Sequence, residues 1–544
     1  MTFQDDVIAP ALDPQAVEYV KEKSRKRTLG NLRLIDQETN AVILVPTPSS
    51  DPNDPLNWST WRKYYVAGVL CLTMAVCNFL AAGPAIAVPA TAMDFYPNAL
   101  TNGTLITSAI PKVAYFFTTT SLLQGMGNIV WVPAANKWGR RPVYILSYII
   151  YLAMAIWLIF EKSYTRFLVG RILMGFGSGA AETLAPISIA DIFFLHERGR
   201  VMSAYTCFLS VGVAGGLVIS GLITIDHTWR AIYQVGTALV GFVLLLLIFT
   251  VPETSYSRTD YHDSPSSDAS DEKQVSTVRE ETQATTKKMS YIESLLVFKA
   301  AGTSENIFKM MIRPFGLIIL PPVLWAALSL AVTIGFLVAV TSNSSAAFNQ
   351  TYGFASYQVG LCYIASIIGS LFGVPAGGHF GDKVADILTK RNNGIREPEM
   401  RLPAVMVSAI TAPLALVLYG VGIQHQLHWI CPTIGLGLLN FSITQSNTIC
   451  IVYVIDSYRP VAGEITLAVT GFKALFAFFL SFETNPWVDL SGYQNAFGAM
   501  AGIAGGVLLM WIPLYIWGKQ IRHHSWQWRV VSFIHWNNDR EVGE

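Results

Sequence analysis

Charged residues are scarce in this sequence. Asp, Glu, Lys and Arg make up only 13% of its 544 residues, about half the share of a soluble globular protein, which excludes an ordinary soluble domain. The net charge is +1, so nothing in the charge balance favours a nucleic-acid partner. The sequence has no HExxH, Gly-x-Ser-x-Gly or P-loop pattern, so it supports neither an enzyme nor an ATP-driven pump.

Cysteine is also sparse, and its distribution excludes two further classes. None of the six cysteines has a neighbour at metal-ligand spacing, and small buried thiols in apolar runs need no other explanation. We therefore predict no disulfide framework, no metal site and no cofactor. The six residues are Cys71, Cys77, Cys207, Cys362, Cys431 and Cys450.

Apolar residues are abundant and come in long runs. They make up 52% of the chain, in stretches of roughly 20 residues, the length that crosses a bilayer as a helix. A β-barrel would instead need alternating segments of about 10 residues, and these runs do not alternate. We predict an all-α polytopic membrane protein with twelve transmembrane helices, near residues 64–88, 104–132, 143–161, 167–190, 201–223, 230–251, 315–341, 356–376, 402–423, 428–454, 463–483 and 494–518.

The charges between these runs predict the topology. With a cytosolic N-terminus, the predicted outer loops hold only the basic residues Lys162, Arg166 and Arg230, and all other loop cations fall inside, as the positive-inside rule requires. Both termini are then cytosolic. Three Asn-x-Ser/Thr patterns fall in predicted outer loops and are glycosylation candidates: Asn102, Asn343 and Asn349.

The runs divide into two groups of six. Between them lies "SPSSDASDEKQVSTVREETQATTKK", a polar, charged stretch whose composition predicts a disordered linker. We predict a cytosolic, disordered N-terminal tail (1–60), a first six-helix bundle (61–254), a cytosolic linker (255–312), a second six-helix bundle (313–518) and a cytosolic tail with an interfacial aromatic and basic segment (519–544).

A basic segment between spans two and three, "WVPAANKWGRRPVY" (131–144), has a counterpart in the second half. We expect its Gly and Pro to let the chain turn tightly there. In "GGHFGDKVADILTKRNNGIREPEMRL", Gly378 and Asp382 share the spacing of Val132 and Asn136. The ends of spans four and ten, "SIADIFFLHERGR" and "YVIDSYRPVAGE", also match, which puts Asp191 and Asp456 at equivalent places. The repeats indicate an internal duplication, although a topology signal alone could explain the basic charges.

Several motifs resemble those of the major facilitator superfamily, in particular its fungal twelve-span branch related to drug:proton antiporters. They are "NKWGRRPVY", "GRILMGFGSG" in span four, "TWRAIYQV" before span six, "VPETSY" after it, "DPNDPLNWS" before span one and "NNGIREPEMRL" after span eight. The resemblance covers essentially all of residues 52–518. It implies two pseudo-symmetric bundles that rock around a central site, in a protein that works as a monomer.

The resemblance also implies a gating loop. Arg140 would pair with Asp191, and position 136 would cap span eleven of the other bundle. This chain departs from the family pattern in having Asn at position 136 and Val at 132, and span five, "GVAGGLVISG", lacks the usual proline. The proposed gating residues are Asn136, Lys137, Gly139, Arg140, Arg141, Asp191, Asp382 and Asp456.

Four ionisable residues lie inside predicted spans, where a charge is costly and asks for a reason: Lys112, Arg171, Glu182 and Lys473. Glu182 is either a proton carrier or part of an internal ion pair. Arg171 matches a family Arg-x-x-x-Gly pattern linked to proton handling, or is satisfied by helix carbonyls. Lys473 has no acid at helical spacing and would attract an acidic substrate unless carbonyls bind it. The excess of cations favours an acidic or neutral substrate.

Further residues could line a substrate cavity. Span ten is rich in amides, of which Asn440 and Gln445 are the favoured substrate contacts, with bonds between helices as the alternative. Tyr115, Phe116 and Trp325 could form cavity walls or could simply pack.

Together these features predict a secondary active transporter, a proton-coupled exporter of small organic molecules such as xenobiotics or secondary metabolites. An importer of a nutrient or polyamine is the alternative, and a non-transporting receptor is a third hypothesis. The expected partners are the substrate, protons and the lipid bilayer. The plasma membrane is the expected location, with the vacuolar membrane as the alternative.

Overall fold

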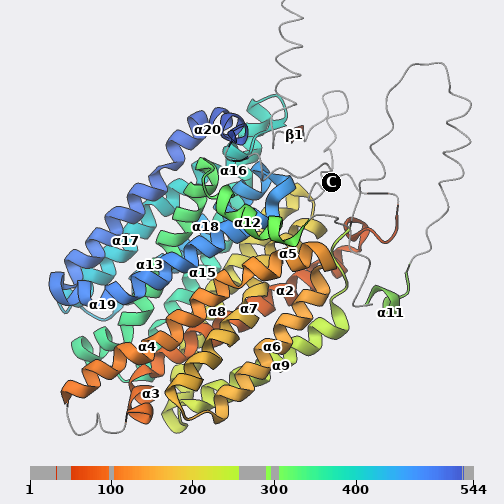
Figure 1. The fold of residues 1–544 in the computed structure, drawn as a ribbon. Coiled ribbons are helices and arrows are strands. Elements are labelled where there is room, and N and C mark those ends of the chain that lie inside the picture. The colour runs from red at the N-terminus through yellow and green to blue at the C-terminus, as the bar shows by residue number, and fades with distance from the viewer. Residues whose placement is uncertain are drawn as a thin grey trace, which may run out of the picture.

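The computed structural model describes residues 32–33, 49, 51–96, 103–256, 289–295, 306–529 and 531. The described chain is almost entirely helical (Figure 1). Its α-helices are α2 (Thr60–Ala82), α3 (Val88–Phe95), α4 (Gly103–Met126), α5 (Asn128–Trp138), α6 (Arg140–Phe160), α7 (Tyr164–Ile192), α8 (Leu195–Asp226), α9 (Arg230–Thr250), α11 (Tyr291–Ser294), α12 (Ile307–Leu317), α13 (Pro321–Tyr352), α14 (Ser356–Cys362), α15 (Ile364–Gly377), α16 (His379–Arg391), α17 (Met406–Gln424), α18 (Ile430–Ser457), α19 (Ala462–Leu509) and α20 (Trp511–Trp526).

Short elements connect these helices. The 3₁₀ helices are η1 (Pro55–Asn57), η2 (Gly83–Ala87), η5 (Pro398–Val405) and η6 (Arg459–Val461). In the described residues the only strands are β1 (Leu32–Arg33) and β2 (Ile395–Arg396), which pair in antiparallel register.

The helices confirm the predicted membrane fold. Ten stretches of the described chain are long and apolar enough to cross a bilayer. The last of them, Ala462–Trp526, holds two antiparallel spans, because the chain reverses inside α19 at Gly492 (φ 77°, ψ 161°). With α4 as a further span, the described helices account for the twelve predicted crossings.

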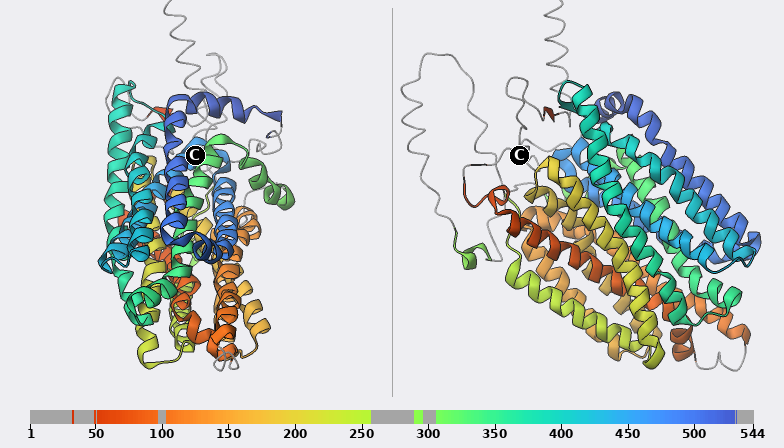
Figure 2. Two further views of the ribbon diagram at one scale, coloured as in Figure 1. Left: turned by 90° about the vertical axis from the view of Figure 1, so that its left-hand side faces the viewer. Right: turned by 180° about the vertical axis from the view of Figure 1, so that it is seen from behind.

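The two halves repeat one packing scheme. In the first half α2 packs along α8, α4 along α7, and α6 along both α7 and α9. In the second half the equivalent helices do the same: α13 packs along α19, α15 along α18, and α17 along both α18 and α19. The halves meet mainly where α4 contacts α19 and α8 contacts α15, which are also equivalent pairs. Figure 2 shows the two bundles side by side along their length.

Glycines let equivalent helices approach closely. A Cβ built on Gly175 or Gly179 of α7 would collide with backbone carbonyl oxygens of α4, and one on Gly373 of α15 would lie 3.0 Å from the carbonyl oxygen of Phe441 in α18. Small residues at these positions allow backbone-to-backbone contact inside a membrane bundle. This close approach positions α7 for the site described below.

The turn between spans two and three differs from the prediction. The basic segment was expected to turn through its Gly and Pro, but Pro133 lies inside α5. Gly139 alone makes the turn, with φ 98° and ψ 162°, and α6 begins at the next residue. This backbone conformation is open to glycine and strained for other residues.

Helices also cross two predicted domain boundaries. α11 and the first half of α12 lie within residues 255–312, the predicted cytosolic linker, after the stretch whose composition predicts disorder. α20 continues past residue 518 into the predicted tail and is tied to η5 by ion pairs of Lys519 with Glu397 (2.8 Å) and Arg522 with Glu399 (3.2 Å). The end of the molecule that carries Gly139, η5 and these ion pairs is the one predicted to face the cytosol, and we call it the inner end.

Candidate functional site

A buried ion pair joins the two bundles at the centre of the molecule. Glu182 lies in α7 of the first half and Lys473 in α19 of the second half, and the Lys473 ammonium donates to the Glu182 carboxylate. Their side chains are only 4% and 10% exposed. The internal ion pair was one of the two hypotheses for Glu182, and the partner of Lys473 comes from another helix, as the lack of an acid at helical spacing required.

The helices around this pair are in tight contact. Thr183 follows Glu182 in α7, and Thr470 lies about one turn before Lys473 in α19. Their hydroxyl oxygens approach to 3.5 Å. A Cβ built on Gly125 of α4 would overlap that of Ala474 in α19. The ion pair therefore lies in a closed interface, and a molecule that reaches either charge must first move the bundles apart.

Neutral polar groups of the first half surround Glu182. The Tyr205 hydroxyl donates to the Glu182 carbonyl oxygen (2.6 Å), and the Cys77 thiol donates to the Ser178 carbonyl oxygen (2.9 Å). The side-chain amide of Gln124 donates to Asn78 Oδ1 (3.5 Å). The sequence analysis missed Asn78, Gln124 and Tyr205, although polar side chains within apolar runs were the signal that would have identified them.

Arg171 is held by backbone carbonyls. Its guanidinium donates to the carbonyl oxygens of Phe116 (2.9 Å), Leu80 (2.9 Å) and Ala81 (3.4 Å), and it lies 4.9 Å from the Phe117 ring centroid. The side chain is fully buried. Among the described residues no carboxylate pairs with it, so the carbonyl-satisfied hypothesis describes its contacts.

Two further predicted pathway residues, Lys112 and Phe116, lie away from the ion pair. Lys112 is exposed, 5.5 Å from the Tyr96 ring centroid. Phe116 is buried among Phe95, Tyr164 and Phe167 in the first bundle. These contacts are those of packing within one bundle.

Trp325 and Tyr115 have different surroundings. The Trp325 indole donates to the Val507 carbonyl oxygen (3.0 Å) and packs on Tyr453 inside the second bundle. Tyr115 instead contacts Phe482 of the other bundle, with ring centroids 5.2 Å apart. Of the three aromatics proposed as cavity walls, only Tyr115 bridges the bundles.

The two favoured span-ten amides bond to groups of the second bundle. Gln445 donates to the Ala404 carbonyl oxygen (2.6 Å) and accepts from Ser408 of α17. Asn440 donates to the Leu436 carbonyl oxygen (3.0 Å) within α18. Both side chains are buried, and of the two only Gln445 makes the bonds between helices that the structural alternative described.

The inner end of the first half contains the pair that the resemblance implied. Arg140 Nε lies 3.4 Å from Asp191 Oδ2, and Arg140 also donates to Asn136 Oδ1 (3.2 Å). A Cβ on Gly463, in the first turn of α19, would lie 3.7 Å from Asn136 Nδ2. Position 136 therefore sits at the start of span eleven, where the resemblance placed it.

Two other basic residues of this segment have separate roles. The Arg141 side chain donates to the Ile248 carbonyl oxygen (2.6 Å) of α9, and Glu253 accepts from the backbone N–H groups of Arg140 and Arg141 (3.0 Å each). Lys137 is half-buried in the last turn of α5. These contacts fix the Gly139 turn against the end of span six.

The second-half copy connects the two bundles with a longer network. Asp456 pairs with Arg198 of α8 (3.3 Å) and with Arg401 (3.9 Å). Arg401 also pairs with Asp382 (2.9 Å), which a Cβ on Gly199 of α8 would approach to 2.5 Å. Asp382 thus sits at the start of span five, as Asn136 sits at the start of span eleven.

Arg396 of β2 completes this network at the inner end. It pairs with Asp386 (3.1 Å) and Asp382 (3.8 Å). Burial, followed by repulsion from Arg401, lowers the pKa of Arg396 to about 10. The guanidinium therefore stays protonated at neutral pH, and the network keeps its charges.

The contacts between the bundles close both ends of the molecule. At the inner end, Arg198 of α8 pairs with Asp456 of α18 (3.3 Å), and about two turns further along each helix the Thr206 and Thr448 hydroxyls lie 2.6 Å apart. At the outer end, a Cβ on Gly221 would lie 3.2 Å from the Tyr357 Cα, and Tyr115 meets Phe482. The ion pair of Glu182 and Lys473 lies between the Arg198–Asp456 pair and the outer contacts, at the depth of Thr206, whose neighbour Tyr205 bonds to Glu182.

The glycosylation candidates differ in burial and in their position in the structure. Asn343 lies inside α13 with its side chain buried and donating to Asn485 Oδ1 (2.9 Å), so the prediction of an outer-loop acceptor there is wrong. The helix extends past the end of the apolar run, to Tyr352. Asn349 is exposed in the last turns of α13, and Asn102 lies outside the described residues.

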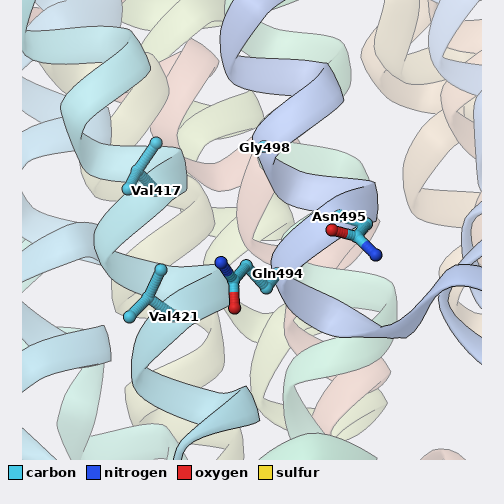
Figure 3. Close-up of a pocket in the computed structure, with 5 residues that line it drawn as sticks. All are labelled: Val417, Val421, Gln494, Asn495 and Gly498. Atoms are coloured by element: carbon cyan, nitrogen blue, oxygen red, sulfur yellow. The ribbon is translucent and has the colours of Figure 1, made fainter.

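One pocket lies apart from the ion pair. It has a volume of about 370 Å³ and lies between α17 and the second half of α19, lined by Val417, Val421, Gln494, Asn495 and Gly498 (Figure 3). None of these five residues contacts Glu182 or Lys473. We assign it no part in transport.

Comparisons with known proteins agree with this architecture. Residues 67–481 match the family model described as Major Facilitator Superfamily. An uncharacterised MFS-type transporter of Schizosaccharomyces pombe is 25% identical over 92% of this chain and 90% of its own length. The efflux pump radE of Floropilus chiversii is 25% identical over 90% and 86%.

A solved structure shows the same fold. The proton:xylose symporter XylE superposes with a TM-score of 0.57 at 16% identity, over 85% of this chain and 96% of its own. The family match spans most of the chain, and the two bundles with equivalent packing are those of the matched structure. The chain belongs to the Major Facilitator Superfamily, and it is therefore a membrane transporter rather than an enzyme.

Proposed function

We propose that this chain is a proton-coupled secondary active transporter that exports small organic molecules by alternating access. The observation that carries the proposal is the ion pair of Glu182 with Lys473. It is buried, it lies at the centre, and it joins the two halves that must separate on one side at a time. A charge pair in this position links the protonation of one residue to the association of the bundles.

The coupling follows from electrostatics in a poorly solvated interface. Removing one member of a buried ion pair leaves an uncompensated charge, which is strongly unfavourable. A proton on Glu182 ends its attraction for Lys473 and frees the ammonium for another partner. Proton and substrate thus act on the same interface, because each changes what Lys473 binds.

The gates would open in turn. Opening the inner side as far as the ion pair must break the Arg198–Asp456 pair at the inner end and the Thr206–Thr448 contact about two turns further along the helices. Opening the outer end must separate Tyr115 from Phe482. Because the ion pair lies between these gates, breaking it loosens the interface that both share.

Export is the proposed direction. It is supported by the resemblance to drug:proton antiporters and by the name of one relative, the efflux pump radE. Import of a polyamine would need several carboxylates facing the cavity, and the centre of the described chain offers Glu182, already paired with Lys473. We propose the plasma membrane as the location and a monomer as the working unit.

Purified protein in proteoliposomes tests the proposal. We expect an imposed pH gradient to drive the movement of at least one class among acidic, neutral and cationic organic compounds, and a protonophore to abolish it. Glu182→Gln should remove the pH dependence while exchange of substrate across the membrane continues. Thr183→Val, which changes the neighbouring contact without a charge, is the matched control and should keep the dependence.

Two outcomes would contradict this function. Movement that ignores the pH gradient in the unaltered protein would remove proton coupling. Full pH dependence in Glu182→Gln would move the proton site away from the ion pair.

A further inference from the structure

We propose that the central site takes an organic monoanion on Lys473 and that one proton travels with it on Glu182. This inference rests on the proposed function and adds the substrate class and the stoichiometry. It follows from the charge balance of the closed interface and from the position of Arg171.

The first step concerns the vacated carboxylate. In the closed state the two charges of the pair cancel, with both side chains at least nine-tenths buried. An anion that binds Lys473 must displace Glu182 and would leave a second negative charge in the same poorly solvated interface. A proton on Glu182 removes that charge, so anion and proton binding favour each other.

The second step excludes the mirror-image arrangement, in which a cation binds Glu182. Such a ligand would leave Lys473 without a counter-charge, and it would enter a region that already holds an extra positive charge. Arg171 lies on the same helix as Glu182, roughly 16 Å away along the axis, and its partners are carbonyl oxygens without a full negative charge. The field of the described centre is net positive and favours an anion.

The third step concerns the other groups near the pair. The titratable side chains that the structure places around Glu182 and Lys473 are Cys77 of α2 and Tyr205 of α8. Both are uncharged in their ordinary forms at neutral pH. Both donate to backbone oxygens, Cys77 to that of Ser178 and Tyr205 to that of Glu182. Neither supplies a charge that could replace the proton.

A neutral substrate fits this site less well. It would have to separate the pair while offering only hydrogen bonds to two full charges, and such bonds compensate poorly for a lost counter-charge. The anion with its proton keeps the site neutral at every stage. Charge balances, since one negative and one positive charge enter together and leave together.

The consequence is co-transport rather than the antiport that the resemblance implies. Anion and proton cross in the same direction, and the cycle moves no net charge. The combined gradients of anion and proton then set the direction. Export occurs when the acid accumulates inside, as expected for a cell that makes an acidic product.

Matched compound series in proteoliposomes test the proposal. Each series shares one ring system and differs only in carrying a carboxylate, an amide or an amine, for example indole-3-acetate, indole-3-acetamide and tryptamine. An aromatic sulfonate is added as an anion that does not cross as the neutral acid, and protein-free vesicles measure diffusion. Pyranine inside the vesicles reports proton movement.

We expect the anions to exchange and to carry protons in their own direction, with an apparent affinity that rises about tenfold for each unit of decrease in pH, as one linked proton requires. Glu182→Gln should still exchange anions, without pH dependence and without proton movement. The double variant Glu182→Gln/Lys473→Met, which buries no charge and keeps the interface neutral, should lose anion exchange at least tenfold. Thr183→Val/Thr470→Val is the matched control and should behave as the unaltered protein.

The outcomes separate this inference from the proposed function. Gradient-driven movement of amides or amines without the anions would overturn the inference and leave proton-coupled transport standing. Anions that move against the direction of protons would overturn the co-transport. If no compound of any class moves in a folded preparation, the proposed function itself fails.

Discussion

Two ionisable residues on one helix, Arg171 and Glu182, have their charges compensated in different ways inside the membrane. Arg171 is satisfied by three carbonyl oxygens from α2 and α4, whereas Glu182 depends on one ammonium from the other bundle. The contacts of Arg171 stay within a bundle that moves as a unit. The contact of Glu182 crosses the interface that opens in the proposed cycle. We therefore expect substitutions at the two residues to have different effects.

Arg171→Lys should lower the stability of the first bundle. Lysine cannot reproduce the planar fork that reaches three separate carbonyls, and bonds to a charged donor are worth about 1.5–3 kcal/mol each. We expect the variant to lose about 2–4 kcal/mol and to show a lower Tm in detergent by tryptophan fluorescence. A variant with an unchanged Tm but no transport would instead assign Arg171 a direct part in transport.

The site residues illustrate what single residues in a sequence can and cannot indicate. Lys473 and Glu182 were identifiable because charges inside apolar runs are rare. Their pairing was not, since they lie 291 positions apart. Asn78 and Gln124 were not identified because amides are sparse in their spans, whereas span ten concentrates several of them.

At the scale of elements, helix ends depend on local backbone chemistry. Spans eleven and twelve were predicted as separate runs, and the structure joins them through a single residue, Gly492, at φ 77° and ψ 161°. The Gln424 side chain closes this turn by accepting from the Tyr493 backbone N–H (2.9 Å). Gly139 makes the equivalent kind of one-residue turn at the inner end.

Gly492→Ala should destabilise this turn. Its φ/ψ region is essentially restricted to glycine, and holding another residue there costs about 1–3 kcal/mol. We expect a lower Tm than that of the unaltered protein in a thermal unfolding scan. Gly498→Ala is the control on the same element, since a Cβ there would meet no atom within 4 Å, and its Tm should stay unchanged. Equal Tm values for both variants would show that the turn relaxes without glycine.

The whole molecule is a pair of repeated bundles held together at the inner end, the centre and the outer end. Equivalent helices make equivalent contacts in both halves, and the interface uses α4 with α19 and α8 with α15 (Figures 1 and 2). The proposed transport cycle moves one half against the other, so a link across the interface should block it and a link within one bundle should not.

A cross-link between α8 and α18 near the depth of the ion pair should arrest transport. The hydroxyl oxygens of Thr206 and Thr448 lie 2.6 Å apart on opposite bundles, close enough for cysteines at these positions to bridge. In a background without the native cysteines, oxidation of Thr206→Cys/Thr448→Cys should reduce substrate exchange at least tenfold, and a reductant should restore it. The measurement is exchange in proteoliposomes before and after oxidation.

The matched control is a cross-link within one bundle. Thr411 and Ser442 also lie 2.6 Å apart, but both belong to the second half. Oxidised Thr411→Cys/Ser442→Cys should transport as before. Transport that survives the first cross-link would mean that α8 and α18 do not separate at Thr206 and Thr448 during the cycle.

The sequence by itself determined the membrane fold, the number of spans and the duplication. These follow from local properties: a run of about 20 apolar residues must be helical in a bilayer, since every backbone polar group needs a partner within the run, and repeated motifs are visible in the letters. Only the tertiary structure decided that Glu182 binds Lys473, that Arg171 binds carbonyls, that Asn343 is buried and that both gates are closed. Those outcomes depend on which helix faces which at distances of a few ångströms, and that geometry is fixed by the packing of the whole molecule rather than by any one segment.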